Sequence, residues 1–259
     1  MSVVLQTNET LITSQQGIRL AKWIAQCGYC SRREASRLIT AGQVTVNGKM
    51  ANHIDHVLPA DTICINAETL AAPGARVTLM YHKPVGIDCN IRAADPASLH
   101  HVLATLPQRL FACGRLDKDS SGLLLLTNDG ELSQQLMHPD FLHEKTYQVT
   151  TDQPLTQTLL QQLASGVSWQ LGKNIYQSRP CQVEQVAANT FQIILTQGLN
   201  RQIRYMCKAV GLRVISLQRI AIGALQLGAL TEGQYQQLDS VALSLLQQAA
   251  FALQTQAQG

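Results

Sequence analysis

Residues 113–127 read CGRLDKDSSGLLLLT. The acidic residue Asp117 lies here in a polar segment with a glycine on each side, and the four leucines 123–126 that follow are typical of a buried strand. A carboxylate at the edge of a core stays ionised most readily beside a cation, because burial favours its neutral form. Asp117, with Arg115 and Lys118 close to it, is therefore a candidate functional residue.

A basic segment further along the chain is one source of such a cation. Residues 198–208 read GLNRQIRYMCK, and the apolar residues 203, 206, 207 and 210 recur with the spacing of one helix face. Arg201, Arg204 and Lys208 lie on another face, and the range 198–219 holds five basic residues and no acidic one. These features alone are compatible with a functional site and with an ordinary surface ion pair, which contributes at most about 1 kcal/mol.

Length and composition exclude several classes of protein. The chain has 259 residues, 46% hydrophobic and 14% charged, which suits one large or two smaller folded domains and excludes a mainly disordered chain. No apolar stretch approaches the roughly 18 residues that a membrane helix needs, and the first residues lack the pattern of a signal peptide. The seven cysteines are odd in number and widely spread, which argues against a disulfide framework. We therefore expect a cytoplasmic protein.

The N-terminal part of the chain is a basic module. Residues 17–51 hold six basic residues and one acidic residue, so their net charge is +5 against +3 for the whole chain, and the remainder sums to −2. The spacing predicts a helix over 20–27, a second helix that begins at the capping box Ser31–Glu34, a hairpin at Asn47–Gly48 and a strand near 62–65. A basic module on a near-neutral body indicates a nucleic-acid partner.

These patterns also predict the domain boundaries. Residues 1–16 form an N-terminal extension, 17–66 the basic module, 67–75 a linker that contains Pro73-Gly74, and 76–259 the body. We expect a helix from Ser240 to pack on the body through Leu243, Leu246, Ala250 and Leu253. Strands of the body are expected at 77–81, 123–127, 147–151 and 191–196.

Signals for other kinds of chemistry are weak. The sequence has no GxSxG, Walker A or GxGxxG motif. Cys27 and Cys30 have the spacing of a metal or redox pair, but no second cysteine pair or neighbouring histidine accompanies them. We therefore predict neither a metal nor a cofactor.

The basic module resembles an S4 RNA-binding domain. The run RLAKWIAQCGYCSRREASRLI of residues 19–39 and the hairpin QVTVNGK of residues 43–49 match that family almost position by position. The resemblance implies RNA contacts, whereas charge spacing alone indicates only an anionic partner. The expected RNA-binding residues of this module are Lys22, Arg32, Arg33, Arg37 and Lys49.

The body resembles the RsuA-type pseudouridine synthases. Residues 114–124, GRLDKDSSGLL, are similar to the signature of that family, and shorter matches are HKPVG (82–86), RLF (109–111), TNDGEL (127–132), EKTY (144–147) and QIR (202–204). An S4 domain before the catalytic domain is the architecture of this family. The resemblance implies an α+β protein, in which a small N-terminal S4 domain precedes a catalytic domain with a mixed, mainly antiparallel sheet.

The resemblance also implies roles for individual residues. Asp117 matches the catalytic nucleophile, and Arg204 matches the basic residue that is paired with it. Tyr147 matches the tyrosine that stacks on the flipped uracil and is a candidate for removing its C5 proton. Arg115 matches the arginine that enters the RNA stack where the target base leaves it. The expected substrate-binding residues are Arg115, Arg201 and Lys83.

The implied reaction is the isomerisation of a uridine to pseudouridine. The N-glycosidic bond breaks, the base turns and C5 joins C1′, so the reaction needs neither a cofactor nor an energy source. Flipping the base costs a few kcal/mol, which phosphate contacts would supply. Because residues 197–204, QGLNRQIR, are most similar to a branch that modifies large-subunit rRNA, the expected partner is 23S rRNA. We expect a monomer that binds no membrane and no metal.

Three alternatives stay open. A non-catalytic RNA-binding or ribosome-assembly protein is expected to have lost one of Asp117, Tyr147 and Arg204. A glycoside hydrolase would use Asp117 with Asp119 or Glu144, but only 5% of the residues are aromatic, and sugar-binding platforms need aromatic rings. The third alternative is the same isomerisation on 16S rRNA or tRNA.

The sequence departs from the family pattern at four places. Tyr205 and Ala221 stand where the family usually has arginine, and His82 and Asp88 are unusual beside the Lys83-Pro84 turn. We expect these departures to weaken the RNA contacts.

Overall fold

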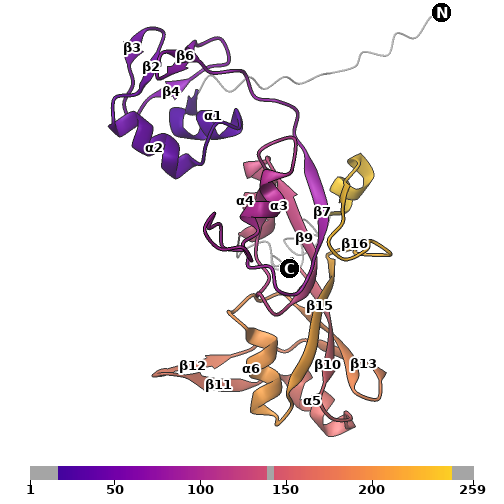
Figure 1. Cartoon of the computed structure of the whole chain (residues 1–259). Coiled ribbons are helices and arrows are strands. Elements are labelled where there is room, and N and C mark those ends of the chain that lie inside the picture. The colour runs from indigo at the N-terminus through magenta and orange to yellow at the C-terminus, as the bar shows by residue number, and fades with distance from the viewer. Residues whose placement is uncertain (1–16, 139–142, 247–259) are drawn as a thin grey trace, which may run out of the picture. The chain divides into compact units, whose positions relative to one another are not determined.

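A computed structural model describes residues 17–138 and 143–246 (Figure 1). The chain divides into two compact units, residues 1–75 and residues 76–259. The expected N-terminal extension, residues 1–16, lies outside the described residues. Within the described ranges, no helix combines the length and the apolar character that crossing a membrane requires.

The small unit packs two helices against short strands. Helix α1 (Leu20–Gln26) contacts helix α2 (Arg32–Thr40), and their apolar faces share one buried core with the strands. Four strands form a sheet in the order β3-β2-β5-β6, and β1 pairs with β4. Their bounds are β1 (Ile18–Arg19), β2 (Val44–Val46), β3 (Lys49–Met50), β4 (His56–Val57), β5 (Ile63–Ile65) and β6 (Glu68–Thr69).

Local sequence explains how these elements begin and end. The Ser31 hydroxyl accepts a hydrogen bond from the Glu34 N–H at 3.1 Å, as the predicted capping box requires, whereas the Glu34 carboxylate accepts one from the Arg37 guanidinium at 3.0 Å. Helix α2 is followed by Gly42 at a φ of +68°, the conformation that glycine adopts after a helix. Asn47 and Gly48 both have a positive φ and make the predicted hairpin turn.

The sheet of the small unit continues beyond residue 66, the expected start of the linker. Asn66 and Ala67 adopt φ angles of +51° and +67° and reverse the chain, so that β6 pairs with β5. Because this turn lacks the Asn-Gly pattern that marks such hairpins, its sequence carries no clear turn signal. The first residues of the range 67–75 therefore belong to the sheet.

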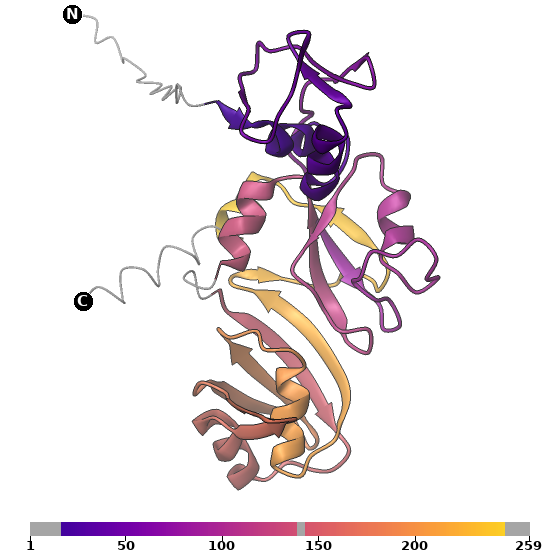
Figure 2. The same ribbon diagram turned by 90° about the vertical axis from the view of Figure 1, so that its left-hand side faces the viewer.

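The large unit contains a nine-stranded mixed sheet. Seven strands follow the order β13-β14-β10-β15-β9-β7-β17, while β8 pairs with β9 and β16 pairs with β15. Only β9 and β15 pair in parallel among the described strands, and Figure 2 shows the long strands β10 and β15 side by side. The bounds are β7 (Thr78–Lys83), β8 (Phe111–Cys113), β9 (Ser121–Thr127), β10 (Lys145–Thr151), β13 (Gln182–Ala187), β14 (Thr190–Leu195), β15 (Val214–Ile222), β16 (Leu225–Gln226) and β17 (Tyr235–Gln237).

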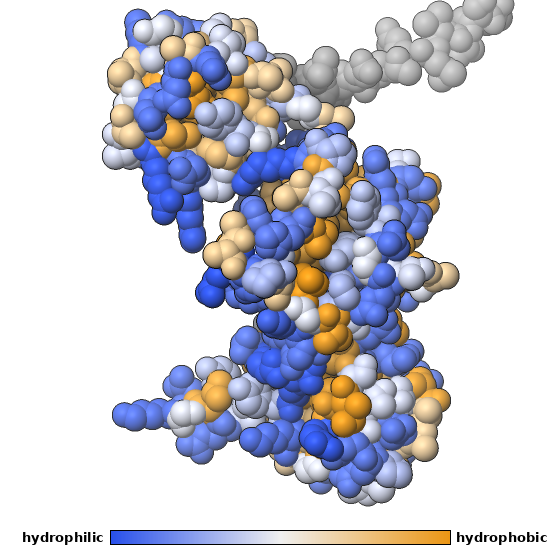
Figure 3. Space-filling view, in the orientation of Figure 1, coloured by the Kyte–Doolittle hydropathy of each residue, from blue (hydrophilic) through white to orange (hydrophobic). Residues whose placement is uncertain are grey.

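Helices and a separate hairpin complete the large unit. Helix α4 begins after Asp129, whose carboxylate accepts hydrogen bonds from the Glu131 and Leu132 N–H groups at 2.9 and 3.2 Å. The hairpin of β11 (Ser168–Leu171) and β12 (Asn174–Gln177) projects from the unit, and its surface in Figure 3 is mainly hydrophilic. The helices are α3 (His100–Ala104), α4 (Gly130–Met137), α5 (Gln157–Ser165) and α6 (Gln202–Ala209).

Strand β9 is buried on both faces, which explains its continuous run of leucines. Leu123 and Leu125 belong to one core together with residues of α4, and Leu124 and Leu126 belong to another core with residues of β7. Successive side chains of a strand point to opposite faces. A strand that lies between two cores therefore carries apolar residues on both faces, without alternating polar residues.

The C-terminal helix is described only over 240–246. The Asp239 carboxylate accepts a hydrogen bond from the Ala242 N–H at 2.8 Å and so begins the helix. Leu246 is buried in the core beneath it and Leu243 is partly buried there, as predicted. Ala250 and Leu253 lie outside the described residues.

Candidate active site

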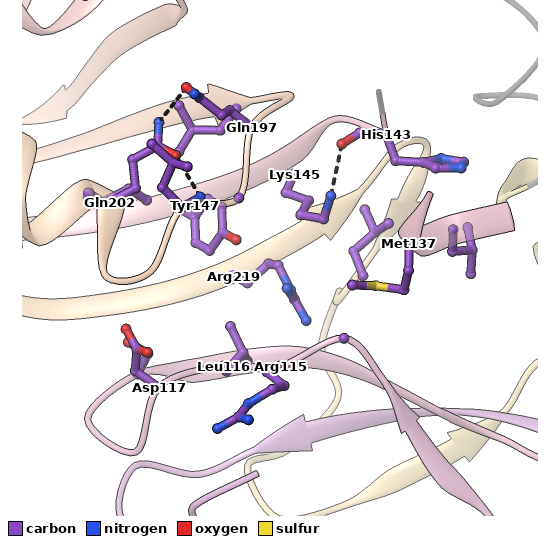
Figure 4. Close-up of a pocket in the computed structure, with 18 of the residues that line it drawn as sticks. Arg115, Leu116, Asp117, Met137, His143, Lys145, Tyr147, Gln197, Gln202 and Arg219 are labelled. Carbon is purple, nitrogen blue, oxygen red and sulfur yellow. Dashed lines mark hydrogen bonds between the residues drawn. The ribbon is translucent and has the colours of Figure 1, made fainter. Parts of the chain in front are cut away.

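A cavity of about 950 Å³ opens in the large unit. Its walls come from the loop 114–120 between β8 and β9, from β10, from the segment 196–201 before α6, and from β15 (Figure 4). Among the described residues that line the cavity, five are arginine or lysine and one, Asp117, is acidic. The basic residues are Arg115, Lys145, Arg179, Arg201 and Arg219.

Asp117 is presented to this cavity by a tightly held loop. Its carbonyl accepts a hydrogen bond from the Ser120 N–H at 3.1 Å, and the next carbonyl, of Lys118, accepts one from the Gly86 N–H at 2.7 Å. Leu116 is buried and anchors the other side of the loop. The Asp117 side chain itself is 28% exposed, so its carboxylate is accessible from the cavity.

Arg201 is the cation that lies next to Asp117. Its Nη1 is 3.8 Å from Asp117 Oδ2, and its two Nη atoms donate to the two carboxylate oxygens of Asp119 at 3.0 and 2.7 Å. Hydrogen bonding to Arg201 holds the pKa of Asp119 below its usual value and outweighs burial, while the same bonds raise the pKa of Arg201. Arg201 thus bridges the two carboxylates.

Arg204, expected to pair with Asp117, is held by Asp119 instead. Its Nη2 donates to the Asp119 carbonyl at 2.6 Å, and its Nε lies 3.3 Å from Asp119 Oδ2. Ser120 adds a longer contact at 3.4 Å. Because residues i and i+3 neighbour each other on a helix, Arg201 and Arg204 reach the same loop from the start of α6. The structure therefore gives the direct contact with Asp117 to Arg201.

Tyr147 lines the cavity from β10. In the strand register it faces Arg219 of β15, and Lys145 precedes it by two residues on the same face. One residue of β15, Ile220, is skipped in this register, which is a β-bulge. The bulge brings Arg219 to the face that also carries Ile222, so both side chains line the cavity.

Lys83 differs from its expected role as a substrate-binding residue. It is fully buried, and its ammonium donates to the carbonyl oxygens of Pro84 and Ile87 at 2.8 Å each. Burial lowers the pKa of Lys83, and negative charge that includes Asp117 and Asp119 opposes this effect. Lys83 therefore holds the turn 84–87 and is not among the described residues that line the cavity.

The other predicted contacts are on the surface of their units. Arg115 is exposed and lines the cavity beside Asp117. In the small unit Lys22 is partly buried, and Figure 3 shows hydrophilic side chains projecting where α2 lies. The expected RNA-binding residues that are exposed in this unit are Arg32, Arg33, Arg37 and Lys49.

Comparison with known proteins identifies the family. The model of the RNA pseudouridylate synthases matches residues 77–209, and that of the S4 domain matches residues 18–63. The chain belongs to the RNA pseudouridylate synthase family. The S4 domain, the synthase fold with its mixed sheet, and the isomerase activity predicted from the sequence are thereby confirmed.

Relatives of this pseudouridine synthase cover most of the chain. It is 37% identical to the dual-specificity RNA pseudouridine synthase RluF of Escherichia coli (strain K12), over 85% of this chain and 75% of that protein. It is 36% identical to the ribosomal large subunit pseudouridine synthase B of Bacillus subtilis (strain 168), over 85% of this chain and 91% of that protein. A crystal structure of a pseudouridylate synthase resembles it with a TM-score of 0.64 and 28% identity, over 89% of this chain and 100% of that chain.

Sequence reasoning missed three polar residues of this synthase. Asp119 entered only as a hydrolase candidate, and Lys145 only within the EKTY motif. The strand expected over 147–151 begins in the structure at Lys145, and with that earlier start the alternation of a strand places Lys145 on the face of Tyr147. No sequence signal could place Arg219, because its direction depends on the bulge in β15.

Tyr205, one of the departures from the family pattern, has a packing role in this synthase. Its ring stacks on Trp169 of β11 with centroids 6.2 Å apart, and the Trp169 ring also stacks on Tyr176 of β12 at 5.9 Å. The tyrosine thus fastens the β11–β12 hairpin to α6, a contact worth about 0.5–1.5 kcal/mol per aromatic pair beyond area burial.

Proposed function

We propose that this pseudouridine synthase isomerises a specific uridine of 23S rRNA, with Asp117 as the catalytic nucleophile. The observation that carries the proposal is the position of Asp117, the single carboxylate among the described residues of a basic cavity, with Arg201 3.8 Å away and Tyr147 in the same lining. Large-subunit rRNA is favoured because a relative that is 36% identical is named for that subunit.

The residue types fit a reaction without a cofactor. Breaking the N-glycosidic bond, turning the uracil and joining C5 to C1′ neither adds nor removes atoms. The Asp117 carboxylate either attacks C1′ or takes a ribose proton to release the base, and both routes begin from the anion beside Arg201. Tyr147 stacks on the flipped uracil and removes the C5 proton, and Arg115 fills the place that the base leaves in the RNA stack.

Asp119 and Arg204 position the groups that react. Asp119 binds both arginines, so it keeps Arg201 within reach of Asp117 without a direct contact to substrate. Arg204, first expected to pair with Asp117, is in this proposal a positioning residue for the loop.

The S4 unit supplies RNA affinity. Arg32, Arg33 and Lys49 are exposed, and Arg37 is exposed although it pairs with Glu34. Together with Lys22 they contact phosphates, which contribute affinity without base specificity. The division into this RNA-binding domain, a linker that follows β6 within 70–75 and a catalytic domain from residue 76 is part of the proposal, as is action as a monomer in the cytoplasm.

A second target has support in a relative's name. The 37% identical Escherichia coli enzyme is called a dual-specificity RNA pseudouridine synthase. We propose that this chain likewise acts on a second RNA class, either 16S rRNA or tRNA.

The test is carbodiimide-block primer extension on a 23S rRNA transcript incubated with the purified chain. The wild type is expected to produce one new stop and the Asp117→Asn variant none, while the variant binds the transcript within a few-fold of the wild type. A Glu184→Gln variant, which changes an exposed carboxylate of β13, serves as the control. Normal turnover by the Asp117→Asn variant would remove that residue from the mechanism. A primer-extension stop on 16S rRNA or tRNA and not on 23S rRNA would show that 23S rRNA is not the target.

A further inference from the structure

Arg219 is a buried cation to which the proposed chemistry gives no role. Its side chain lines the cavity, although the residue is only 3% exposed. Its Nε donates to the Leu123 carbonyl at 2.7 Å, and its Nη2 has no hydrogen-bond partner among the described residues. A buried polar group without a hydrogen-bond partner costs free energy. The Nη2 atom of Arg219 is therefore a candidate donor to an acceptor on a bound ligand.

Lys145 brings a second positive charge to the same place. Its ammonium donates to the His143 carbonyl at 3.1 Å, and the titratable groups that face it are Arg219, Cys113 and the His143 ring. No carboxylate is among these groups in the described part of the chain. Burial and, next, the charge of Arg219 lower the pKa of Lys145 to about 8.

The fold forces the two cations together. Lys145 and Tyr147 share one face of β10, and Arg219 lies opposite Tyr147 because of the bulge at Ile220. Figure 4 shows Arg219 between the strand that carries Lys145 and the loop that carries Arg115. Two cations held side by side without an acid favour the binding of an anion.

We propose that Arg219 and Lys145 form a binding subsite for one phosphate group of the RNA backbone, next to the flipped nucleotide. A phosphate offers negative charge and several acceptor oxygens, so it satisfies both cations, whereas a uracil carbonyl satisfies one donor and neutralises neither. The cavity of about 950 Å³ has room for more than a base. The inference rests on the proposed function only in taking the phosphate from RNA.

The first test uses inorganic phosphate and no RNA. The full chain is labelled at its lysines with acetic anhydride over a pH series, with phosphate or with chloride at equal ionic strength, and the labelling of Lys145 is read by mass spectrometry. Without phosphate its labelling should rise near pH 8. Phosphate should move that midpoint to higher pH, and the exposed Lys173 should not change. If phosphate does not move the pH midpoint of Lys145 labelling, the proposed subsite is wrong.

The second test separates binding from chemistry. Lys145→Gln should raise KM for the rRNA transcript about tenfold, the effect of losing one charge-assisted hydrogen bond, and should change kcat much less. The KM of the wild type should rise above pH 8. Lys145→Arg should restore KM and abolish that rise, because arginine keeps its charge. Lys173→Gln is the matched control.

The outcomes distinguish the two proposals. An unchanged KM in Lys145→Gln, or a Lys145→Arg variant as impaired as Lys145→Gln, would contradict the phosphate subsite and indicate a purely structural lysine. A wild-type chain that modifies no RNA but shows the phosphate shift at Lys145 would contradict the proposed function and leave the anion site standing.

Discussion

At the scale of single residues, Asp119 holds the basic side chains that surround Asp117. It accepts two hydrogen bonds from Arg201 and one, through its carbonyl, from Arg204. Among the described residues, the Asp117 carboxylate has the single, longer contact with Arg201 at 3.8 Å, so it stays open to the cavity. The acid that binds the cations and the acid proposed to react are therefore different residues two positions apart.

Removing the Asp119 side chain should impair turnover more than stability. In Asp119→Ala both arginines lose their carboxylate, so we expect kcat to fall at least about tenfold, with a smaller rise in KM, because the loss of a charge-assisted hydrogen bond is of this size. Since Asp119 is 46% exposed, the free energy of unfolding should change by at most about 1 kcal/mol. Single-turnover kinetics and urea unfolding test this, and a normal kcat would remove Asp119 as a positioning residue.

Lys145 should make stability depend on pH in a defined direction. Its pKa of about 8 in the folded chain lies below the value of about 10.4 in an unfolded chain. Between these values the unfolded state binds more protons, so this residue's contribution to stability rises with pH, and below pH 8 its full cost is present. Buried cysteine thiols with raised pKa values, such as Cys181 at about 11, act in the opposite direction.

Comparison with a variant isolates this contribution. The free energy of unfolding in urea should increase in the wild type relative to Lys145→Gln between pH 8 and about 10, and the difference should be constant below pH 8. A difference that is independent of pH across that window would contradict the lowered pKa.

At the scale of elements, the site depends on the place where β9 and β15 meet. Gly122 faces Arg219 in the parallel pair at a φ of +109°, and a Cβ there would overlap the Arg219 backbone. The bulge at Ile220 then directs Arg219 into the cavity. The absence of a side chain at Gly122 on β9 and the extra residue Ile220 on β15 together determine where Arg219 lies.

Gly122→Ala should therefore be strongly destabilising. Both the positive φ and the overlap with backbone oppose the substitution, and we expect a loss of at least about 2 kcal/mol in the free energy of unfolding. Gly130→Ala, at the first residue of α4 with open space around its Cβ, should be neutral or slightly stabilising. If Gly122→Ala and Gly130→Ala had equal free energies of unfolding, the close approach of β9 to β15 at Gly122 would be contradicted.

At the scale of the whole molecule, two basic surfaces serve one polyanionic substrate. The charged residues that line the cavity of the large unit are mostly basic, and the small unit exposes Arg32, Arg33 and Lys49. Phosphate contacts add affinity that weakens as salt rises, whereas the proposed chemistry takes place in the cavity.

Neutralising the S4 surface should change the salt dependence of RNA binding and leave the reaction intact. In the triple variant Arg32→Gln, Arg33→Gln and Lys49→Gln the slope of log K against log salt should decrease in magnitude by about 2–3, since each phosphate contact contributes close to one. Turnover at saturating RNA should persist. Filter binding at several salt concentrations measures the slope, and an unchanged value would exclude these residues from phosphate contact.

The sequence alone determined what depends on local patterns. The helix faces of the S4 module, the Asn47–Gly48 turn, the buried leucine strand and the loop that carries Asp117 all follow from spacing, because periodicity reports which side chains are buried. The tertiary structure decided which charges meet. Arg204 contacts Asp119 and not Asp117, Lys83 is buried, and Arg219 enters the cavity, because these contacts join segments far apart in the chain through a helix start, a turn and a β-bulge whose geometry no local pattern encodes.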